Sequence, residues 1–527
     1  MLRTMSNSPP TAPTRSDLPP RGAPAAELPP PPAPGAHVPE HPAPPRRWLA
    51  LVCISIAQMM VALDATVINI ALPSAQRALH VTDAERQWVI TAYTLAFGGL
   101  LLLGGRLSDT VGRRRTFLLG LVGFAAASAA GGAAPNFAAL VGARTAQGAF
   151  AALLAPAALS LLALTFTEAR ERAKAFAVFG AIAGTGGAVG LLLGGVLTEY
   201  LQWRWCLYVN LPIAVGALLL GRRVLPRTPA VRGPRLDLAG AALASGGLVA
   251  VVYGLSEAAS KGWSSAPSLG ALSIGAVLLG AFVVAESRVA APLVPLRILR
   301  DRNRSGAYLG IALAVIGMFG LFLLLTYDFQ VVLRYSPARA GVAFLPLSAA
   351  VLLSSTTISR QLLPRVPPRW LVVPGLLVAA AGMATLTGLG IHSSYGAHIL
   401  PGELLLGLGM GAVFVPAFST ATAGVGPREA GVASALANTS QQIGASVGTA
   451  LLNTIATAAT AAYGASHAHG GRGVAQALVH GYATAAGWAA VILVVAAVLT
   501  GVLINARPAG ANHATTASAP SSGSGSG

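Results

Sequence analysis

The sequence predicts an all-α protein that crosses a lipid bilayer about fourteen times. Of its 527 residues, 54% are hydrophobic and only 10% are charged, whereas soluble chains carry about 25% charged residues. Apolar runs of about 20 residues, each long enough to span a bilayer as a helix, recur along the whole chain. Arginine residues gather in alternate connections between these runs, which is typical of loops on the cytoplasmic side.

The apolar runs fix the order of the predicted spans. We expect them at 48–72, 87–107, 116–134, 138–164, 175–198, 205–224, 236–256, 268–286, 306–329, 340–362, 370–390, 397–420, 430–457 and 479–504. The seventh and eighth runs are rich in Gly, Ala and Ser.

The distribution of Lys and Arg tests this count and sets the topology. With the N-terminus in the cytoplasm, the inside connections hold roughly three times as many basic residues as the outside ones. Arg113–Arg115 and Arg222–Arg223 are two of the inside clusters. The pattern predicts a protein of the inner (cytoplasmic) membrane with both termini in the cytoplasm. It also accounts for the net charge of +18 without a nucleic-acid partner.

The two ends of the chain differ from the apolar body. Residues 1–45 are rich in proline and lack the apolar core of a signal peptide, so we expect a disordered cytoplasmic tail. Residues 507–527 are of low complexity and are expected to form a second disordered tail. Cys53 and Cys206 lie inside apolar runs, which argues against a disulfide framework.

The connection after the second span has a distinctive glycine and charge pattern. It reads Gly105-Arg-Leu-Ser-Asp109-Thr-Val-Gly112-Arg113. The two glycines permit a tight turn and close helix approach, and Asp109 can pair with an arginine or a helix N-terminus. This run resembles the signature loop of the major facilitator superfamily. We expect Gly105, Asp109, Gly112 and Arg113 to act as a conformational latch; the alternative is a plain basic loop.

Three further runs, in the same order, resemble the fourteen-helix drug:proton antiporters of the EmrB/QacA type. Span 1 contains Leu63-Asp64-Ala-Thr-Val-Ile-Asn69-Ile-Ala-Leu-Pro73, and span 4 contains Arg144-Thr-Ala-Gln147-Gly148. Span 5 is glycine-rich, and Gly184, Gly187, Gly190 and Gly194 are its expected helix-packing motif. Leu191 stands where that motif usually has proline, so this helix is expected to be straighter.

The resemblance implies a domain organisation. It implies the major facilitator fold, with pseudo-symmetric six-helix halves at 46–224 and 301–506 joined by two linker transmembrane helices within 225–300. It also implies that spans 1 and 4 face a central cavity and that Arg144 takes part in proton coupling.

Asp64 and Arg144 are the main candidates for proton coupling. A charge inside the bilayer costs several kcal/mol unless it is paired or hydrated. Asp64 lies roughly 12 Å, and Arg144 roughly 9 Å, from the outer ends of their spans, so the two are at similar depth. A carboxylate binds protons weakly beside an arginine and strongly in an apolar cavity, so movement between the two environments exchanges a proton. The alternative is that Asp64 merely neutralises Arg144.

Two acidic residues in the second half are further candidates. Glu403 precedes Gly407 by four residues, as Arg144 precedes Gly148, and pseudo-symmetry would place it at the same cavity. It is expected to attract cationic substrates, to carry a proton, or to snorkel to the interface. Asp328, at the outer end of span 9, is either a hydrated carboxylate or a gate or cation contact.

Other polar residues are weaker candidates. Gln147, Asn438 and Gln441 could contact substrate, form a gate or join helices. His467, His469 and His480 fall in an outer loop, and a solvated loop is preferred there to a metal site. The sequence shows no Walker loop and no nucleophile–base or metal-ligand cluster, which argues against ATP, a metal, a cofactor or an enzyme.

The predicted function is proton-coupled efflux of drugs or antibiotic-like metabolites by alternating access. The expected partners are small apolar or cationic substrates, protons and the bilayer, and the chain is expected to be a monomer. Two alternatives remain: a proton-coupled uptake symporter on the same fold, and a membrane sensor that does not transport.

Overall fold

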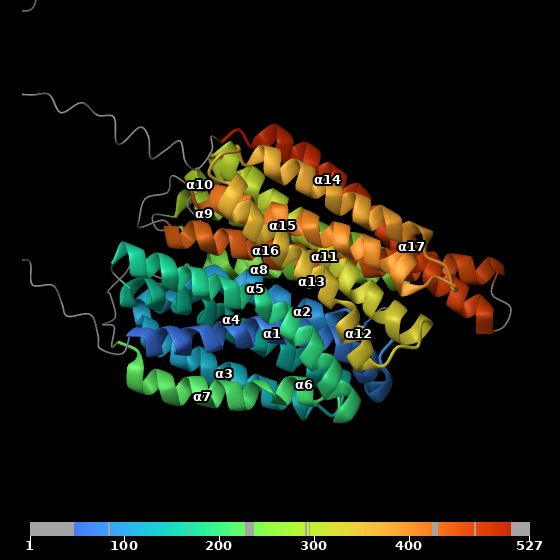
Figure 1. Ribbon diagram of the computed structural model, residues 1–527, viewed down its shortest axis with the longest axis horizontal. Helices are drawn as coiled ribbons and strands as arrows, with labels where there is room; N and C mark the ends of the chain where they lie inside the picture. The colour runs from blue at the N-terminus through green and yellow to red at the C-terminus, as the bar shows by residue number, and fades with distance from the viewer. Residues whose placement is uncertain are drawn as a thin grey trace, which may run out of the picture. The chain divides into compact units, whose positions relative to one another are not determined.

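The computed structural model describes residues 47–82, 85–166, 168–226, 237–289, 292–294, 296–423, 430–467 and 471–506. Within these ranges every regular element is a helix (Figure 1). The predicted tails, 1–45 and 507–527, lie outside the described residues. The all-α class predicted from the sequence is confirmed.

The first group of helices covers the N-terminal part of the chain. It comprises α1 (Arg47–Leu79), α2 (Trp88–Val111), α3 (Arg113–Gly132), α4 (Phe137–Thr165), α5 (Ala169–Tyr200), α6 (Trp205–Tyr208) and α7 (Asn210–Val224). Gly112, with φ of 101°, makes the turn between α2 and α3. Asn136 caps α4 by accepting a hydrogen bond from the Ala139 N–H at 2.9 Å.

The remaining helices form a hairpin and a second group. The hairpin is α8 (Leu238–Lys261) and α9 (Ala266–Arg288). The second group comprises α10 (Leu296–Arg300), α11 (Arg302–Tyr327), η1 (Asp328–Val332), α12 (Pro337–Ala343), α13 (Leu345–Thr357), η2 (Ile358–Leu362), α14 (Arg369–Thr385), η3 (Leu386–Gly388), η4 (Tyr395–Ile399), α15 (Leu400–Thr422), α16 (Ala430–His467) and α17 (Gly471–Leu503).

Each predicted span falls on a helix or on two or three consecutive helical segments. Within the described residues, eleven helices are long and apolar enough to cross a membrane, and α2 and α8 contain shorter apolar stretches. The chain is therefore a multi-pass membrane protein, while the count of about fourteen crossings stays a prediction.

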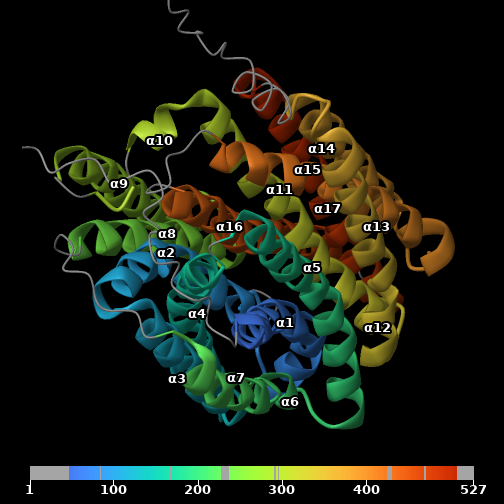
Figure 2. The ribbon, with the colours of Figure 1, turned by 60° about the vertical axis from the view of Figure 1, so that its left-hand side comes forward.

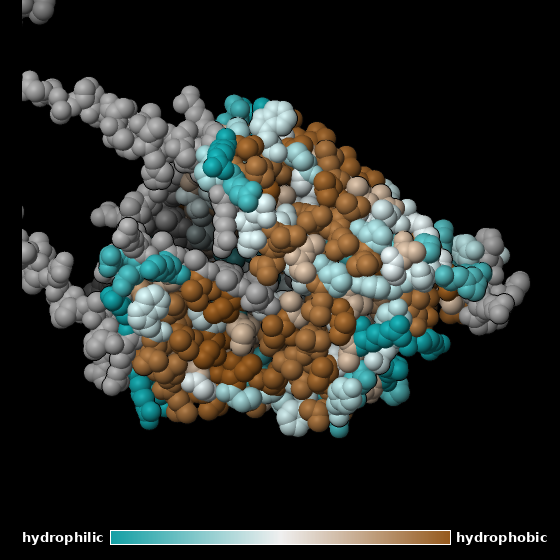
Figure 3. All heavy atoms as spheres, in the orientation of Figure 1, coloured by the Kyte–Doolittle hydropathy of each residue, from teal (hydrophilic) through white to brown (hydrophobic). Residues whose placement is uncertain are grey.

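The surface of the bundle is apolar between its two ends. Large side chains on the outside of α9 and α17 are well exposed, with Val277 at 70% and Val502 at 65%. Figure 3 shows a broad hydrophobic surface on the face in view, with hydrophilic residues gathered toward the helix ends. Such a band suits the hydrocarbon layer of a bilayer, because lipid tails replace water around it.

Glycines set the closest helix crossings in the first group. A Cβ on Gly148 would lie 2.2 Å from the Tyr93 carbonyl oxygen, and one on Gly104 would lie 2.0 Å from the Ala152 carbonyl oxygen. The backbones of α2 and α4 therefore touch, as is common where small residues meet in membrane helices. This contact holds the middle of α4 firmly beside α2 and α1.

The α8–α9 hairpin lies against the seam between the two groups. Helix α8 packs on both α2 and α16 (Figure 2). Thr454 of α16 donates a hydrogen bond to the Leu255 carbonyl of α8 at 2.8 Å, and Ser245 of α8 donates to the Gly99 carbonyl of α2 at 3.2 Å. The hairpin thus contacts both groups at once.

Candidate functional site

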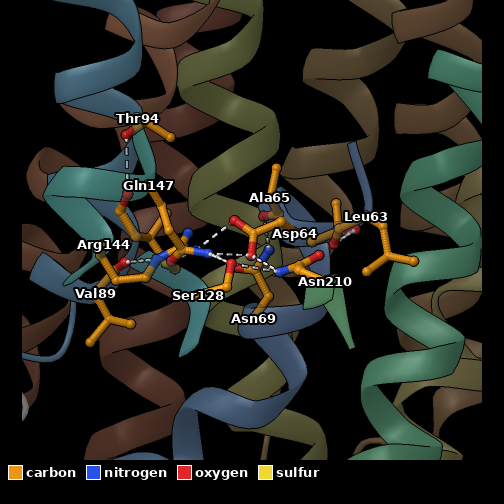
Figure 4. A network of polar contacts seen from close by, with 12 residues as sticks. Leu63, Asp64, Ala65, Asn69, Val89, Thr94, Ser128, Arg144, Gln147 and Asn210 are labelled. Atoms are coloured by element: carbon orange, nitrogen blue, oxygen red, sulfur yellow. Dashed lines mark hydrogen bonds and ion pairs between the residues drawn. The ribbon is translucent and has the colours of Figure 1, made fainter. Parts of the chain in front are cut away.

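A buried ion pair lies between α1 and α4. Arg144 Nη1 donates to Asp64 Oδ2 at 2.6 Å, and both side chains are at most 1% exposed (Figure 4). The structure brings together the two residues that the sequence placed at similar depth. Because unpaired charges are costly in this setting, each stabilises the other against burial.

Three neutral side chains complete the network around Asp64. Gln147 and Asn210 donate to Asp64 Oδ1 at 3.0 and 2.8 Å, so the carboxylate accepts three side-chain hydrogen bonds. Ser128 Oγ accepts from Gln147 at 2.7 Å and from Asn210 at 3.4 Å. Figure 4 shows these three side chains, from α3, α4 and α7, gathered beside Asp64 of α1.

Arg144 is held by more than its carboxylate. Its Nε donates to the Val89 carbonyl at 3.0 Å, and its Nη1 also donates to Gln147 Oε1 at 3.0 Å. The guanidinium carbon lies 4.4 Å from the centre of the Tyr93 ring, a cation–π distance. These contacts therefore fix the position of the Arg144 side chain.

Sequence reasoning missed part of this network. Ser128, Tyr93 and Asn210 were not candidates, although Asn210 is a polar residue at the start of an apolar helix. A polar residue at the first position of an apolar helix is the signal that could have identified Asn210. Gln147 was expected near substrate or a gate, and it lies instead inside the ion-pair network.

Glu403 is the buried acid of the second group. It is fully buried on α15, and its Oε2 accepts a hydrogen bond from the Tyr395 hydroxyl at 3.1 Å. Within the described residues, its Oε1 has no hydrogen-bond partner. The expectation that Glu403 snorkels to the interface is wrong for this structure, because no part of the side chain reaches the surface.

Asp328 begins the π-helical turn η1 and is 4% exposed. It borders a small apolar cavity that is also lined by Leu325, Met383 and Tyr482. The interpretation as a hydrated interfacial carboxylate is therefore wrong for this state. The neighbouring Phe329 ring packs against Tyr395, so Asp328 lies near the residue that holds Glu403.

The predicted latch is described only in part. Gly112 makes the expected tight turn, and Arg113 begins α3. The close helix approach falls at Gly104 rather than at Gly105, whose Cβ position lies 3.8 Å from its nearest neighbour. The side chain of Asp109 lies outside what the structure describes. Residues 105–111 belong to helix α2 rather than to a loop, and Arg106 there donates to the Pro292 carbonyl at 2.7 Å.

The glycine motif of α5 packs against α1. A Cβ on Gly190 would lie 2.1 Å from Thr66 Oγ1, and one on Gly194 would lie 2.6 Å from the Val67 carbonyl. Gly187 has ordinary spacing, 3.8 Å from Thr66, and the surroundings of Gly184 lie outside the described side chains. α5 runs unbroken past Leu191, which is buried.

The remaining candidates have modest contacts. Asn438 donates to the Ser434 carbonyl of its own helix at 3.0 Å, and Gln441 is half-buried beside it. His480 stacks on Tyr463, with ring centres 4.6 Å apart. The side chain of His467, and the whole of His469, lie outside the described residues.

The two groups are joined at one end by an interhalf clamp, which we define as Gln76, Arg86, Tyr327 and Asn453. Arg86 Nε donates to Asn453 Oδ1 at 3.2 Å, and its guanidinium lies 3.7 Å from the centre of the Tyr327 ring. The Tyr327 hydroxyl donates to Gln76 Oε1. This clamp lies where α1 ends and α2 begins.

Comparison with known proteins places the chain among transporters. A family model described as Major Facilitator Superfamily matches residues 54–449. A solved bacterial homologue of the human lysosomal transporter Spinster, inward-facing and unoccupied, has a TM-score of 0.62 with 17% identity, covering 87% of this chain and 97% of that one. This likeness concerns the fold alone.

Several relatives are more similar to this chain in sequence than the solved transporter is. The chain is 53% identical to the puromycin resistance protein pur8 of Streptomyces alboniger over 477 residues, 90% of this chain and 94% of that protein. It is 42% identical to the cephamycin export protein CmcT of Amycolatopsis lactamdurans over 409 residues, 77% and 84% of the two chains. It is 34% identical to a tetracenomycin C resistance and export protein of Streptomyces glaucescens over 417 residues, 78% and 76%.

Proposed function

The chain belongs to the major facilitator superfamily, and from that premise we propose that it exports small antibiotic-like molecules across the cytoplasmic membrane in exchange for protons. Relatives named for resistance to, or export of, antibiotics support export. We further propose that it works as a monomer with both termini in the cytoplasm, as the distribution of basic residues predicts.

The observation that carries the mechanism is the Asp64–Arg144 pair. The Asp64 carboxylate accepts three hydrogen bonds, one of them from Arg144. If rocking of the halves withdraws Arg144 or admits water, Asp64 takes up a proton, and re-formation of the pair expels it. Alternating access would make the two events face opposite sides of the membrane.

Everted membrane vesicles test the direction and the coupling. An antiporter that exports drugs from cells is expected to collapse an inside-acid pH gradient when substrate is added. Each substrate molecule that enters the everted vesicle is exchanged for protons that leave it. An uptake symporter would not dissipate the gradient in this way, and a sensor would leave it unchanged. Either of those results would overturn the proposal.

The interhalf clamp would close the outer side of the transporter. In the predicted topology, Arg86 lies on the outer side, so its contacts with Tyr327 and Asn453 hold the structure closed there. Replacing Arg86 with alanine is expected to populate a state with a separated outer end. Spin labels on Arg77→Cys and Ala462→Cys, with Cys53 and Cys206 replaced by serine, should then show an additional longer distance by electron spin resonance.

Arg339 provides a matched control for this substitution. Its guanidinium lies 3.9 Å from the centre of the Tyr335 ring, but both residues belong to the second group. Arg339→Ala removes a similar cation–π contact without touching the clamp, so the distance should not change. Equal distance distributions in the Arg86→Ala protein and the wild type would show that the clamp does not hold the outer end closed.

Glu403 is proposed to recognise positively charged substrates from the second half. Within the described residues its carboxyl contacts only the neutral Tyr395 hydroxyl, so it has no resident cation to displace. Replacing Glu403 with glutamine is expected to lower the export of cationic dyes about tenfold, the loss of one charge-assisted contact. Export of neutral substrates should be retained.

The variant Glu85→Gln serves as a control, because within the described residues the exposed Glu85 carboxylate accepts hydrogen bonds from Thr82 of its own loop and lies outside the second group. Initial rates for cationic and neutral substrates should be unchanged in that variant. Equal losses for both classes in Glu403→Gln would instead identify Glu403 as a second proton carrier, as the sequence allowed.

A further inference from the structure

The α8–α9 hairpin carries two acidic side chains that the proposed transport cycle does not use. Asp237 caps α8, and its Oδ1 accepts a hydrogen bond from the Gly240 N–H at 2.7 Å. Glu286, on the last turn of α9, is 3% exposed, and its Oε2 accepts from the Val294 N–H at 3.0 Å. In each carboxyl group, therefore, one oxygen accepts a backbone hydrogen bond and the other does not.

The two remaining oxygens border the same small space. Within the described residues, Asp237 Oδ2 and Glu286 Oε1 are buried and have no hydrogen-bond partner. A Cβ built on Gly240 would lie 2.5 Å from Asp237 Oδ2 and 2.9 Å from Glu286 Oε1. Glycine at this position thus leaves the two oxygens facing one another over its Cα atom.

Within the described residues, no cation contacts either of these two oxygens. The groups that act on the Glu286 carboxyl in the described residues are Asp237 and the N–H groups of Leu293 and Val294. Three arginines lie on the adjoining elements: Arg106 donates to the Pro292 carbonyl, while Arg288 and Arg297 are exposed. If both groups were ionised, the two buried oxygens would carry like charges side by side, which is unfavourable without a compensating cation.

We propose that Asp237 and Glu286 form a proton-binding site in which a single proton bridges Asp237 Oδ2 and Glu286 Oε1. The proton joins the start of α8 to the end of α9. Glu286 also holds Val294, and the same short segment, 292–294, accepts a hydrogen bond from Arg106 near the end of α2. Loss of the proton would leave two negative charges side by side and loosen the hairpin from α2.

Infrared spectroscopy of the purified protein in lipid nanodiscs at neutral pH tests the site directly. In difference spectra against the wild type, the protonated-carboxyl signal of this pair should be lost or shifted in Asp237→Asn and also in Glu286→Gln, because the bridged arrangement needs both carboxyl groups. Gly240→Ala keeps both carboxyl groups but fills the space between them, and should shift the band. The measurement requires no transport, so its failure would leave the proposed function intact.

Glu257 is the matched control on the same helix. It forms an ion pair with Lys261 at 2.7 Å, so Glu257→Gln should leave the protonated-carboxyl band unchanged. A difference spectrum that shows no change in protonated-carboxyl signal in Asp237→Asn or in Glu286→Gln would overturn the shared proton, and signal from the separate buried acids Glu403 and Asp328 cancels in such a spectrum. Calorimetric binding of Mg²⁺ or Ca²⁺ to the wild type, abolished in both variants, would overturn it in favour of a bridging metal ion.

Discussion

Replacing Asp64 with asparagine is expected to reduce proton-driven export to the level of vesicles without the protein. The asparagine amide cannot carry the exchanged proton, and it presents an N–H group to side chains that are themselves donors. Arg144 would be left buried without its counter-ion, a change that costs about 3–5 kcal/mol. Collapse of the pH gradient on addition of substrate to everted vesicles measures the loss.

A second variant separates the loss of the proton carrier from the loss of stability. In Asp64→Asn with Arg144→Gln, the buried charges are removed together, so thermal stability in detergent should recover much of its wild-type value. Proton-coupled export should not recover, because no titratable group remains at this point. Full export by either variant, with protons still moving, would exclude Asp64 from the mechanism.

The sequence was sufficient to predict the class of fold and the pairing of Asp64 with Arg144. Long apolar runs leave few alternatives to membrane helices, because backbone polar groups in lipid must be satisfied within the helix. The sequence predicts the pairing of Asp64 with Arg144, because a buried charge needs a partner and the two residues lie at similar depths in their spans. Gln147, three residues after Arg144, lies on the same face of α4, as helical spacing dictates.

Other parts of the site could not be predicted, for identifiable physical reasons. Asn210 reaches Asp64, and Ser128 reaches Asn210 and Gln147, only because of how α7 and α3 are rotated against α1 and α4. The apolar runs of membrane helices carry little information on rotation. Tyr395 meets Glu403 because the chain forms the π-helical turn η4 just before α15. Local irregularities of this kind are absent from hydrophobic patterns.

The contact between α5 and α1 explains how Gly190, which lies outside the polar network, would control the position of Asp64 within it. Gly190 approaches Thr66 and the Leu63 carbonyl so closely that a Cβ would lie 2.1 Å from Thr66 Oγ1 and 2.8 Å from the Leu63 oxygen. These two residues flank Asp64 on α1. The position of α5 therefore fixes the turn of α1 that carries the carboxylate.

Replacing Gly190 with valine is expected to abolish export and to lower the stability of the bundle by about 1–3 kcal/mol, the usual cost of overpacking. The added atoms would force α5 away from α1 and displace Asp64 relative to Arg144. Gly142→Val is the matched control, because Gly142 on α4 has no atom within 4 Å of its Cβ position and should tolerate valine.

Gly190→Ala combined with Thr66→Ala removes the nearest clash and should recover part of the activity lost in Gly190→Ala alone. If Gly190→Val exported substrate as well as Gly142→Val, the carboxylate would not depend on this helix crossing, and the glycines of α5 would need another explanation.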